Sequence, residues 1–247
     1  MNDKAGKENE YVVLITGANR GIGFEFVKQY LAKGWYVIAG VRRPDAATDL
    51  QALAEEYPQV TIEPLDVCDL SSVDALAARL EGQPIDVLIN NAGFFGEFGN
   101  QGFGALDHDQ FDLFMRTNAR GPLKMSEAFV PHLKAGRQKK IVAITSQAGS
   151  FELDSGGLPG MYFYKSSKAA LNMIMRNVAK DLKEHGIAVG ILSPGMVNTA
   201  GDIPPERRFP GLIEPPESIA GMIKVIDELD LDHTGSFIRY SGDPQPW

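Results

Sequence analysis

Short apolar runs rich in β-branched residues recur along this chain, and segments of helical character separate them. Runs of this kind are typical of strands that are buried on both faces of a parallel sheet. The expected strands are 11–15, 36–39, 60–64, 85–89, 141–144, 187–192 and 236–240. The expected helices are 24–33, 46–57, 70–80, 107–133, 161–185 and 216–229. This alternation predicts a single α/β domain over residues 11–247, with a doubly wound, parallel seven-stranded sheet and helices on both faces.

Composition and charge narrow the class of protein. The chain has 247 residues, 44% of them hydrophobic, which is enough for the core of one large domain. A net charge of −8 argues against nucleic acid or an anionic membrane surface as the main partner. The single cysteine excludes an intrachain disulfide, and the histidines lack zinc-ligand spacing, so no metal is expected. Residues 1–10 read as a disordered tail without a signal peptide, and no apolar run reaches ~20 residues, so we expect a cytoplasmic protein.

Three glycines, Gly17, Gly21 and Gly23, lie between the first strand and the first helix. Glycines in such a turn let the backbone bend sharply and approach a pyrophosphate at the helix N-terminus, as in the Rossmann fold. The spacing is GxxxGxG rather than GxGxxG, but the strand–turn–helix context is present. The alternative is a tight turn that binds no ligand.

Tyr164 and Lys168 are four residues apart in a segment expected to be helical, so they share one face of the helix. An ammonium beside the phenol is expected to lower the pKa of Tyr164 from about 10. A tyrosine tuned in this way can exchange a proton with a carbonyl or an alcohol. Ser146 could donate a second hydrogen bond to the same oxygen. Taken alone, the pair could equally be surface residues of an amphipathic helix.

Six motifs in order give the chain a resemblance to the classical short-chain dehydrogenases/reductases. They are TGxxxGIG over 16–23, NNAG over 90–93, Asn118, Ser146, YxxxK over 164–168, and Pro194-Gly195 followed by Thr199. The resemblance covers about residues 11–247. The ending 242–247, together with 146–150, is more narrowly similar to the C-factor-like carbonyl reductase branch.

The resemblance implies roles for particular residues. Tyr164 would be the general acid/base, and Lys168 would lower its pKa and bind the nicotinamide ribose. Ser146 would orient the carbonyl, and Asn118 would hold a water in a proton relay. The implied cofactor-binding residues are Gly17, Asn19, Arg20, Gly21, Ile22, Gly23, Arg42, Asp66, Val67, Asn90, Ala92, Gly93, Tyr164, Lys168, Pro194, Gly195, Val197 and Thr199.

Three of those residues bear on the adenosine half of the cofactor. By resemblance, Asp66 contacts the adenine, Val67 packs behind it, and Asn90 lies beside the ribose. The alternative for Asp66 is that it caps the helix beginning near Leu70, a position for which Asp69 and Ser71 are also candidates.

The residues after the second strand bear on the choice of cofactor. NAD binders of this fold usually have an acidic residue there, whereas this chain has Arg42 and no carboxylate before Asp45. A guanidinium attracts a 2′-phosphate, and Arg20 in the glycine turn would lie on the same side. The sequence therefore predicts NADP(H) in preference to NAD(H). The alternative is a pair of solvated surface arginines.

Pro122 lies inside the expected helix 107–133. Proline has no N–H to donate to the carbonyl of Asn118, four residues earlier, so we expect a bend and a carbonyl that a water could reach. This hypothesis makes Pro122 part of the relay site. A bend that only follows the curvature of the sheet is the alternative.

Three loops, 94–106, 147–160 and 195–214, are expected at the carboxyl ends of the strands, where ligands bind in this architecture. Their apolar residues predict an apolar pocket, although loop anchoring or subunit contacts would also explain them. The apolar residues are Phe94, Phe95, Phe98, Phe103, Phe151, Met161 and Met196. Residues 154–157 are expected to bulge outward, which makes Ser150 a substitute candidate for Ser146. The loop 195–214 is expected to be a mobile lid.

The sequence thus predicts an NADP(H)-dependent oxidoreductase that moves a hydride between nicotinamide and a carbonyl or secondary alcohol. One alternative is a cofactor-binding signalling or sensor protein of the C-factor type with little turnover. An epimerase or dehydratase is disfavoured by the glycine spacing and the short C-terminal part. The resemblance also implies a homodimer or homotetramer.

Overall fold

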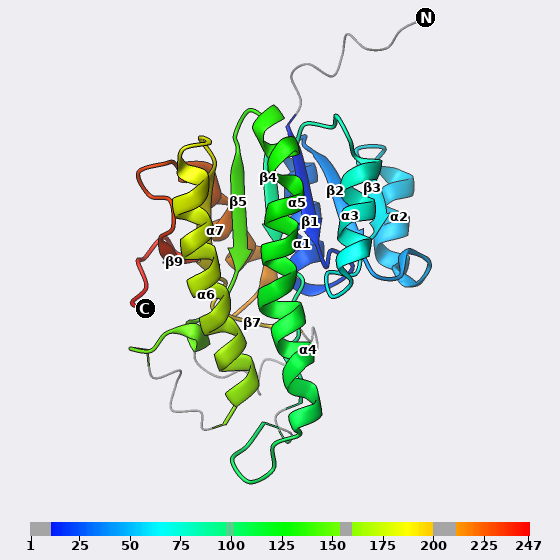
Figure 1. The fold of residues 1–247 in the computed structure, drawn as a ribbon. Helices are drawn as coiled ribbons and strands as arrows, with labels where there is room; N and C mark the ends of the chain where they lie inside the picture. The colour runs from blue at the N-terminus through cyan, green and yellow to red at the C-terminus, as the bar shows by residue number, and fades with distance from the viewer. Residues whose placement is uncertain (1–10, 98, 100, 154–159, 200–210) are drawn as a thin grey trace, which may run out of the picture.

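A computed structural model describes residues 11–97, 99, 101–153, 160–199 and 211–247. The strands are β1 (Val12–Thr16), β2 (Tyr36–Val41), β3 (Val60–Pro64), β4 (Val87–Asn90), β5 (Lys140–Ile144), β6 (Ala188–Ser193) and β9 (Phe237–Arg239). They form one sheet in the order β3-β2-β1-β4-β5-β6-β9 (Figure 1), and every neighbouring pair is parallel. The predicted parallel seven-stranded sheet is confirmed.

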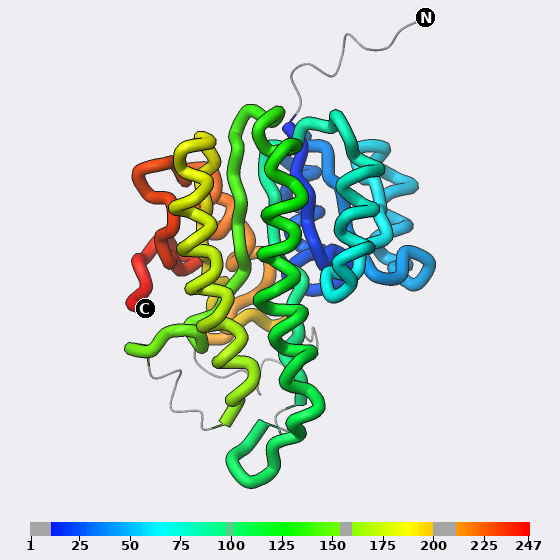
Figure 2. The backbone as a smooth tube through the Cα atoms, in the orientation of Figure 1, coloured from blue at the N-terminus to red at the C-terminus, as the bar shows by residue number. Residues whose placement is uncertain are grey.

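Helices cover both faces of the sheet, as predicted (Figure 2). The helices are α1 (Gly21–Ala32), α2 (Thr48–Glu56), α3 (Leu70–Arg79), α4 (Phe111–Met115), α5 (Gly121–Ala135), α6 (Tyr162–Lys183) and α7 (Pro215–Glu228). Buried side chains of α1, α2 and α7 pack on one face, and those of α3, α5 and α6 pack on the other. Short 3₁₀ turns are η2 (Pro44–Ala46), η4 (His108–Gln110) and η6 (Gln147–Gly149).

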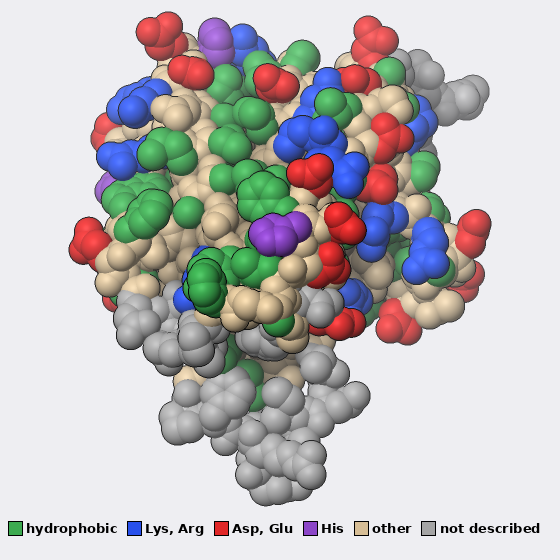
Figure 3. Space-filling view, turned by 60° about the horizontal axis from the view of Figure 1, so that its bottom comes forward, with side chains coloured by type: hydrophobic (Ala, Val, Ile, Leu, Met, Phe, Trp, Pro, Cys, Tyr) green, Lys and Arg blue, Asp and Glu red, His purple; other side chains and the backbone are tan. Residues whose placement is uncertain are grey.

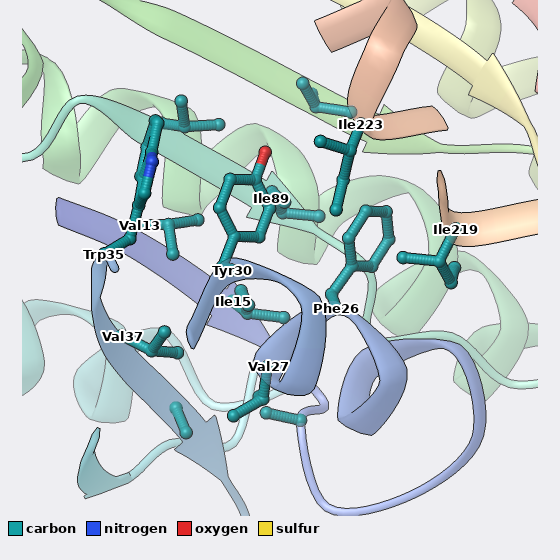
Figure 4. Packing of buried hydrophobic residues seen from close by; sticks show 14 of the residues in the cluster. Val13, Ile15, Phe26, Val27, Tyr30, Trp35, Val37, Ile89, Ile219 and Ile223 are labelled. Carbon is teal, nitrogen blue, oxygen red and sulfur yellow. The ribbon is translucent and has the colours of Figure 1, made fainter. Parts of the chain in front are cut away.

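The packing of α1 shows how the apolar pattern fixes a helix to the sheet (Figure 4). Phe26 and Tyr30 are one helical turn apart, and both are fully buried against the strand residues Ile15 and Ile89. Burial of the Phe26 side chain contributes about 1.5–3 kcal/mol. These contacts hold the start of α1, and with it the glycine turn, at a fixed place over the sheet.

Four strands, β1, β2, β4 and β6, extend further toward their carboxyl ends than expected. β2 continues to Val41 and β4 continues to Asn90, so Arg42 and Asn91 follow directly at the edge where ligands bind. Residues 195–214, expected as a loop, contain a small parallel pair, β7 (Met196–Val197) with β8 (Leu212–Ile213). The expected tail 1–10, the bulge at 154–157 and most of the expected lid, 200–210, lie outside the described residues.

The expected helix 107–133 is broken into several pieces. α4 is followed by a π-helical turn, η5 (Arg116–Arg120), and then by α5. In this turn the N–H of Gly121 donates to the carbonyl of Arg116, five residues back. Because Pro122 has no N–H, an α-helical bond to Asn118 cannot form. The expected irregularity is therefore present, and it surrounds Asn118, as π turns often do at functional sites.

Across the described part of the chain, no helix combines the length and apolar character needed to cross a bilayer. In the same residues, no group of three or more His, Cys, Asp or Glu side chains is placed to hold a metal ion.

Candidate active site

The carboxyl ends of β1 and β4 are locked together by Thr16 and Asn91. Thr16 Oγ1 accepts hydrogen bonds from the backbone N–H groups of Asn91 (3.0 Å) and Ala92 (2.9 Å). In return, the Asn91 side-chain amide donates to the carbonyl oxygens of Thr16 (2.9 Å) and Gly17 (3.1 Å). The NNAG segment thus fixes the position of the glycine turn.

Close backbone packing explains why two of the glycines are needed. Gly17 has φ +68°, and a Cβ there would lie 2.9 Å from the Cα of Ala92. A Cβ on Gly23 would lie only 2.2 Å from the carbonyl oxygen of Gly17. Any side chain at Gly23 would therefore force the turn and α1 apart.

The N-terminus of α1 is built to receive an anion. Arg20 is the N-cap residue, its side chain makes no capping hydrogen bond, and the first turn holds no acidic residue. The first amide groups of the helix therefore keep their donors for a ligand. Thr199, from the segment after β6, lies above this turn, because a Cβ on Gly21 would be 3.6 Å from its side chain. Asn19 and Arg20 are exposed, and Ile22 is partly buried.

The residues expected around adenosine gather at the ends of β2, β3 and β4. Arg42 is exposed directly after β2. The Asp66 carboxylate accepts from the N–H of Cys68 (2.9 Å), whereas the N-cap of α3 is Asp69, which accepts from Ser71 (3.0 Å). The alternative in which Asp66 caps this helix is therefore wrong. Val67 packs against Gly121 at the start of α5.

Asn90 provides a test of whether a cofactor fits this site. Its side chain is 2% exposed, and neither its amide oxygen nor its amide nitrogen has a partner among the described residues. Buried polar groups are almost always hydrogen-bonded, so an orphaned amide calls for a ligand or water. Together with the open N-terminus of α1, it fits a nucleotide lying along the carboxyl edge of the sheet.

Ser146, and not Ser150, reaches Tyr164. The side chain of Ser146 hydrogen-bonds to the Tyr164 hydroxyl, and its Oγ also accepts from the N–H of Ala148 (3.1 Å). Ser150 Oγ is used within its own loop, where it accepts from the N–H groups of Glu152 (3.2 Å) and Leu153 (3.0 Å). Tyr164 itself is the third residue of α6, which begins at Tyr162.

Lys168 lies one turn further along α6, as expected. Its side chain is buried, and its Nζ donates to the carbonyl oxygen of Ile144 (2.8 Å) at the end of β5. Burial lowers the pKa of Lys168 to about 8. Gly93 lies beside it, since a Cβ there would be 3.9 Å from Nζ.

The direction of the Tyr164 pKa differs from the expectation. Burial raises the pKa of Tyr164, and the hydrogen bond from Ser146 offsets this only in part. The Lys168 Nζ is 5.8 Å from the centre of the Tyr164 ring and is engaged by Ile144, so the lysine does not outweigh desolvation.

The side chain of Asn118 is fully occupied. Its Nδ2 donates to the carbonyl of Phe94 (2.8 Å) and to Ser167 Oγ (2.9 Å), and its Oδ1 accepts from the N–H of Phe94 (2.7 Å). Asn118 therefore ties the substrate loop to α6 beside the catalytic candidates. Its backbone carbonyl has no α-helical partner at Pro122.

The expected substrate region contains a cleft of about 550 Å³, lined by Arg20, Gly93, Phe94, Phe95, Gly96, Glu97 and Gln110. The ring of Phe95 stands edge-on to that of Tyr164, with centroids 4.7 Å apart. Phe103 and Phe151 are 87% and 88% exposed. Figure 3 turns the lower end of the molecule forward and shows hydrophobic side chains gathered across the middle of the face in view.

The remaining predicted residues follow β6. Pro194 is buried, and its carbonyl oxygen accepts from Ser218 Oγ of α7 (2.7 Å). Gly195 has φ +77° and packs against Tyr240 and Ile213, while Val197 lies in β7. Together with Thr199 they bring this segment over the start of α1.

Two contacts near the site were not found from the sequence. Gln101, fully buried, accepts from the N–H of Tyr164 (3.1 Å). Gln147, next to Ser146, donates to the side chain of Gln245 near the C-terminus (2.7 Å). Gln101 belongs to no motif. Gln147 and Gln245 lie in the segments 146–150 and 242–247 that carry the narrower resemblance, but a glutamine carries no periodic signal that would pair residues so distant in sequence.

Comparison with known proteins gives consistent likenesses. A family model described as short chain dehydrogenase matches residues 11–206. The C-signal protein of Myxococcus xanthus is 37% identical over 174 residues, covering 70% of this chain and 99% of that protein. The 1-hydroxy-2-glutathionyl-2-methyl-3-butene dehydrogenase of Rhodococcus sp. (strain AD45) is 37% identical over 240 residues, covering 95% and 99%.

Among solved structures, the NADPH-bound carbonyl reductase from chicken fatty liver matches with a TM-score of 0.88 at 35% identity, covering 96% of this chain and 99% of that one. These likenesses and the six ordered motifs point to the same kind of protein.

Proposed function

This chain belongs to the short-chain dehydrogenase family, and from that premise we propose that it is an NADP(H)-dependent oxidoreductase acting on a carbonyl or secondary alcohol. The observation that carries the proposal is the placement of Tyr164 on α6 next to Ser146, with Lys168 buried on the same face of the helix and bonded to Ile144. This group lies beside a glycine turn whose open helix N-terminus suits a pyrophosphate.

The cofactor, when bound, supplies or takes up a hydride at its nicotinamide ring. The N-terminal amides of α1 would hold its pyrophosphate, Asn90 and Asp66 its adenosine, and Lys168 its nicotinamide ribose. The segment from Pro194 to Thr199 would close over it. The exposed guanidinium groups of Arg20 and Arg42 would hold the 2′-phosphate, which is our reason for preferring NADP(H).

The chain's own residues would manage the proton. Because burial raises the pKa of Tyr164, its hydroxyl is protonated at neutral pH and can donate its proton to a carbonyl oxygen. Ser146 Oγ already accepts from Ala148, which leaves its own proton for the same oxygen. Lys168 and a water at the backbone carbonyl of Asn118 would return a proton to Tyr164.

The walls of the cleft indicate the kind of substrate. Phe94 and Phe95 line it, and Phe95 stands against the Tyr164 ring. We therefore propose an apolar small molecule whose carbonyl or hydroxyl reaches between Ser146 and Tyr164. A homodimer or homotetramer in the cytoplasm stays our expectation from the family.

A second candidate function is a cofactor-binding sensor or signalling protein. The likeness to the C-signal protein of Myxococcus xanthus is the observation that favours it. Such a protein needs the nucleotide site but has no need of Ser146, Tyr164 and Lys168 together, so turnover separates the two candidates.

The test is NADPH oxidation against a panel of aldehydes, quinones, diketones and steroids. We expect turnover of at least one apolar carbonyl, and Tyr164→Phe should lower kcat by about a thousandfold, since general acid catalysis contributes 10²–10⁴-fold. NADPH affinity of the variant should fall far less than kcat, because the other cofactor-binding residues remain. Full activity of Tyr164→Phe would overturn the mechanism, and tight NADPH binding with no turnover would favour the sensor.

A further inference from the structure

Gln101 is a fully buried polar side chain that the proposed mechanism does not use. Its Oε1 accepts from the backbone N–H of Tyr164 (3.1 Å), and its Nε2 donates to the carbonyl oxygen of Phe95 (2.9 Å). A longer contact joins Nε2 to the carbonyl of Glu97 (3.4 Å). One side chain therefore holds both the helix that carries Tyr164 and the loop that carries Phe95.

The start of α6 explains why a distant acceptor is needed. The residue at the N-cap, Met161, has the left-handed backbone conformation (φ 54°) and makes no side-chain capping bond. Helices are normally capped at this point by a Ser, Thr, Asp or Asn oxygen from the N-cap residue itself. Here the Gln101 amide oxygen, from 63 residues earlier in the chain, satisfies an N–H of the first turn.

Two glycines leave the space that Gln101 fills. A Cβ on Gly96 would lie 3.2 Å from Gln101 Nε2 and 2.5 Å from the ring of Phe114. A Cβ on Gly160 would lie 3.1 Å from the backbone oxygen of Gln101. Both glycines also have positive φ, so the chain on each side is shaped to fit closely around this residue.

We propose that Gln101 is a positioning residue, which sets the Tyr164 end of α6 and the Phe95 wall of the cleft at a fixed separation. The inference rests on the proposed function. The oxygen of Gln101 places the helix, and its nitrogen places the wall. Since the Phe95 and Tyr164 rings are 4.7 Å apart, a small shift of either changes the gap into which a carbonyl must fit.

Two substitutions separate the two halves of this role. Gln101→Glu keeps an oxygen for the Tyr164 N–H and, when ionised at alkaline pH, has no donor for the Phe95 carbonyl. Gln101→Met, similar in size, removes both. We expect Gln101→Glu to raise KM for an apolar substrate about tenfold with kcat within about threefold, since only the wall is released. Gln101→Met should in addition lower kcat at least tenfold, while NADPH affinity stays unchanged in both.

The matched control is Gln51→Met. Gln51 lies on α2, far from the cleft in the fold, and its Nε2 donates to a backbone carbonyl of Pro44 (3.0 Å). The control loses the same kind of hydrogen bond, and its KM and kcat should equal those of the unmodified protein.

Amide hydrogen exchange gives a readout that does not depend on turnover. Gln101→Met should speed exchange at least tenfold both at Tyr164 and at 94–97, whereas Gln101→Glu should do so at 94–97 alone. Unchanged exchange at both places in Gln101→Met overturns the inference even if the enzyme is active. If Gln101→Met does not fold, the pattern in Gln101→Glu decides, and rapid exchange at Tyr164 in that variant overturns it. If the proposed function is wrong and the role of Gln101 is right, the exchange patterns will be the expected ones but the protein will show no turnover.

Discussion

The cofactor side and the substrate side of the cleft are built in different ways. On the cofactor side, main chain packs on main chain, and a Cβ at Gly23 would lie 2.2 Å from a carbonyl oxygen. On the substrate side, the described parts of the loops are held by long-range side-chain bonds, among them Gln101 with Tyr164 and Gln147 with Gln245. Phe103 and Phe151 there are almost fully exposed.

The contrast teaches where variation is tolerated. A turn of interlocked backbone accepts almost no substitution, so the packing of this turn restricts which residues it can hold. Loops tied at a few points can change their exposed side chains freely so long as the ties remain. The same fold can therefore keep one cofactor and change its substrate.

Gly23→Ala is the strongest test of this contrast. The added methyl must displace the Gly17 carbonyl or the Asn91 amide, so we expect NADPH affinity to fall at least a hundredfold and the melting temperature to drop. Fluorescence titration of NADPH and thermal unfolding measure both. The control on the substrate side is Gly102→Ala, where an added Cβ meets no atom within 4 Å. Equal losses of NADPH affinity and of melting temperature in the two variants would contradict this contrast between the two sides of the cleft.

Lys168→Met tests the buried charge that joins the two sides. With its pKa at about 8 in the fold and 10.5 when unfolded, Lys168 holds a proton only in the unfolded chain between those values. Raising the pH through this window therefore stabilises the cofactor-free protein, by about 3 kcal/mol in full. Urea unfolding from pH 7 to 10 should show this rise, and Lys168→Met should lack it. Parallel pH profiles for the two proteins would contradict the assignment.

Arg42→Asp tests the cofactor side without disturbing its backbone. Replacing an exposed guanidinium by a carboxylate beside a 2′-phosphate should lower the affinity for NADPH about tenfold or more. The affinity for NADH should stay the same or rise. Arg43→Asp makes the same charge change one residue further on and should have the smaller effect. Identical NADPH and NADH affinities before and after the change at Arg42 would argue against the NADP(H) preference.

Phe151→Ser should have the smallest effect. The side chain is 88% exposed, so the free energy of unfolding should change by no more than about 0.5 kcal/mol. NADPH affinity should be the same, and only KM for an apolar substrate is expected to rise. A loss of more than about 1 kcal/mol in chemical denaturation would show that Phe151 anchors its loop.

Much of the cofactor side could be predicted from the sequence because its signals are local. Apolar runs marked the strands, three glycines marked the turn, and the spacing of Tyr164 and Lys168 marked a shared helix face. All of these follow from backbone periodicity or from contacts between near neighbours in the chain.

The substrate side and the electrostatics could not be predicted in the same way. The cap on α6 comes from Gln101, and nothing in the local sequence around either partner signals that contact. The rise in the pKa of Tyr164 depends on how far the folded chain desolvates the phenol, which spacing alone does not show. The pairing of β7 with β8 likewise joins two residues from each side of a long connection.

The π turn at Arg116–Arg120 has a consequence for how this helix can change by insertion and deletion. Such a turn holds one residue more than the α-helical turn it replaces. Removing one residue there would therefore restore a regular helix and leave α5 in nearly the same rotational position relative to α4. Phe129 and Leu133 would stay in the core. The surplus residue beside Asn118 can thus be lost without unpacking the helix that follows, and its loss would change the helix only beside Asn118.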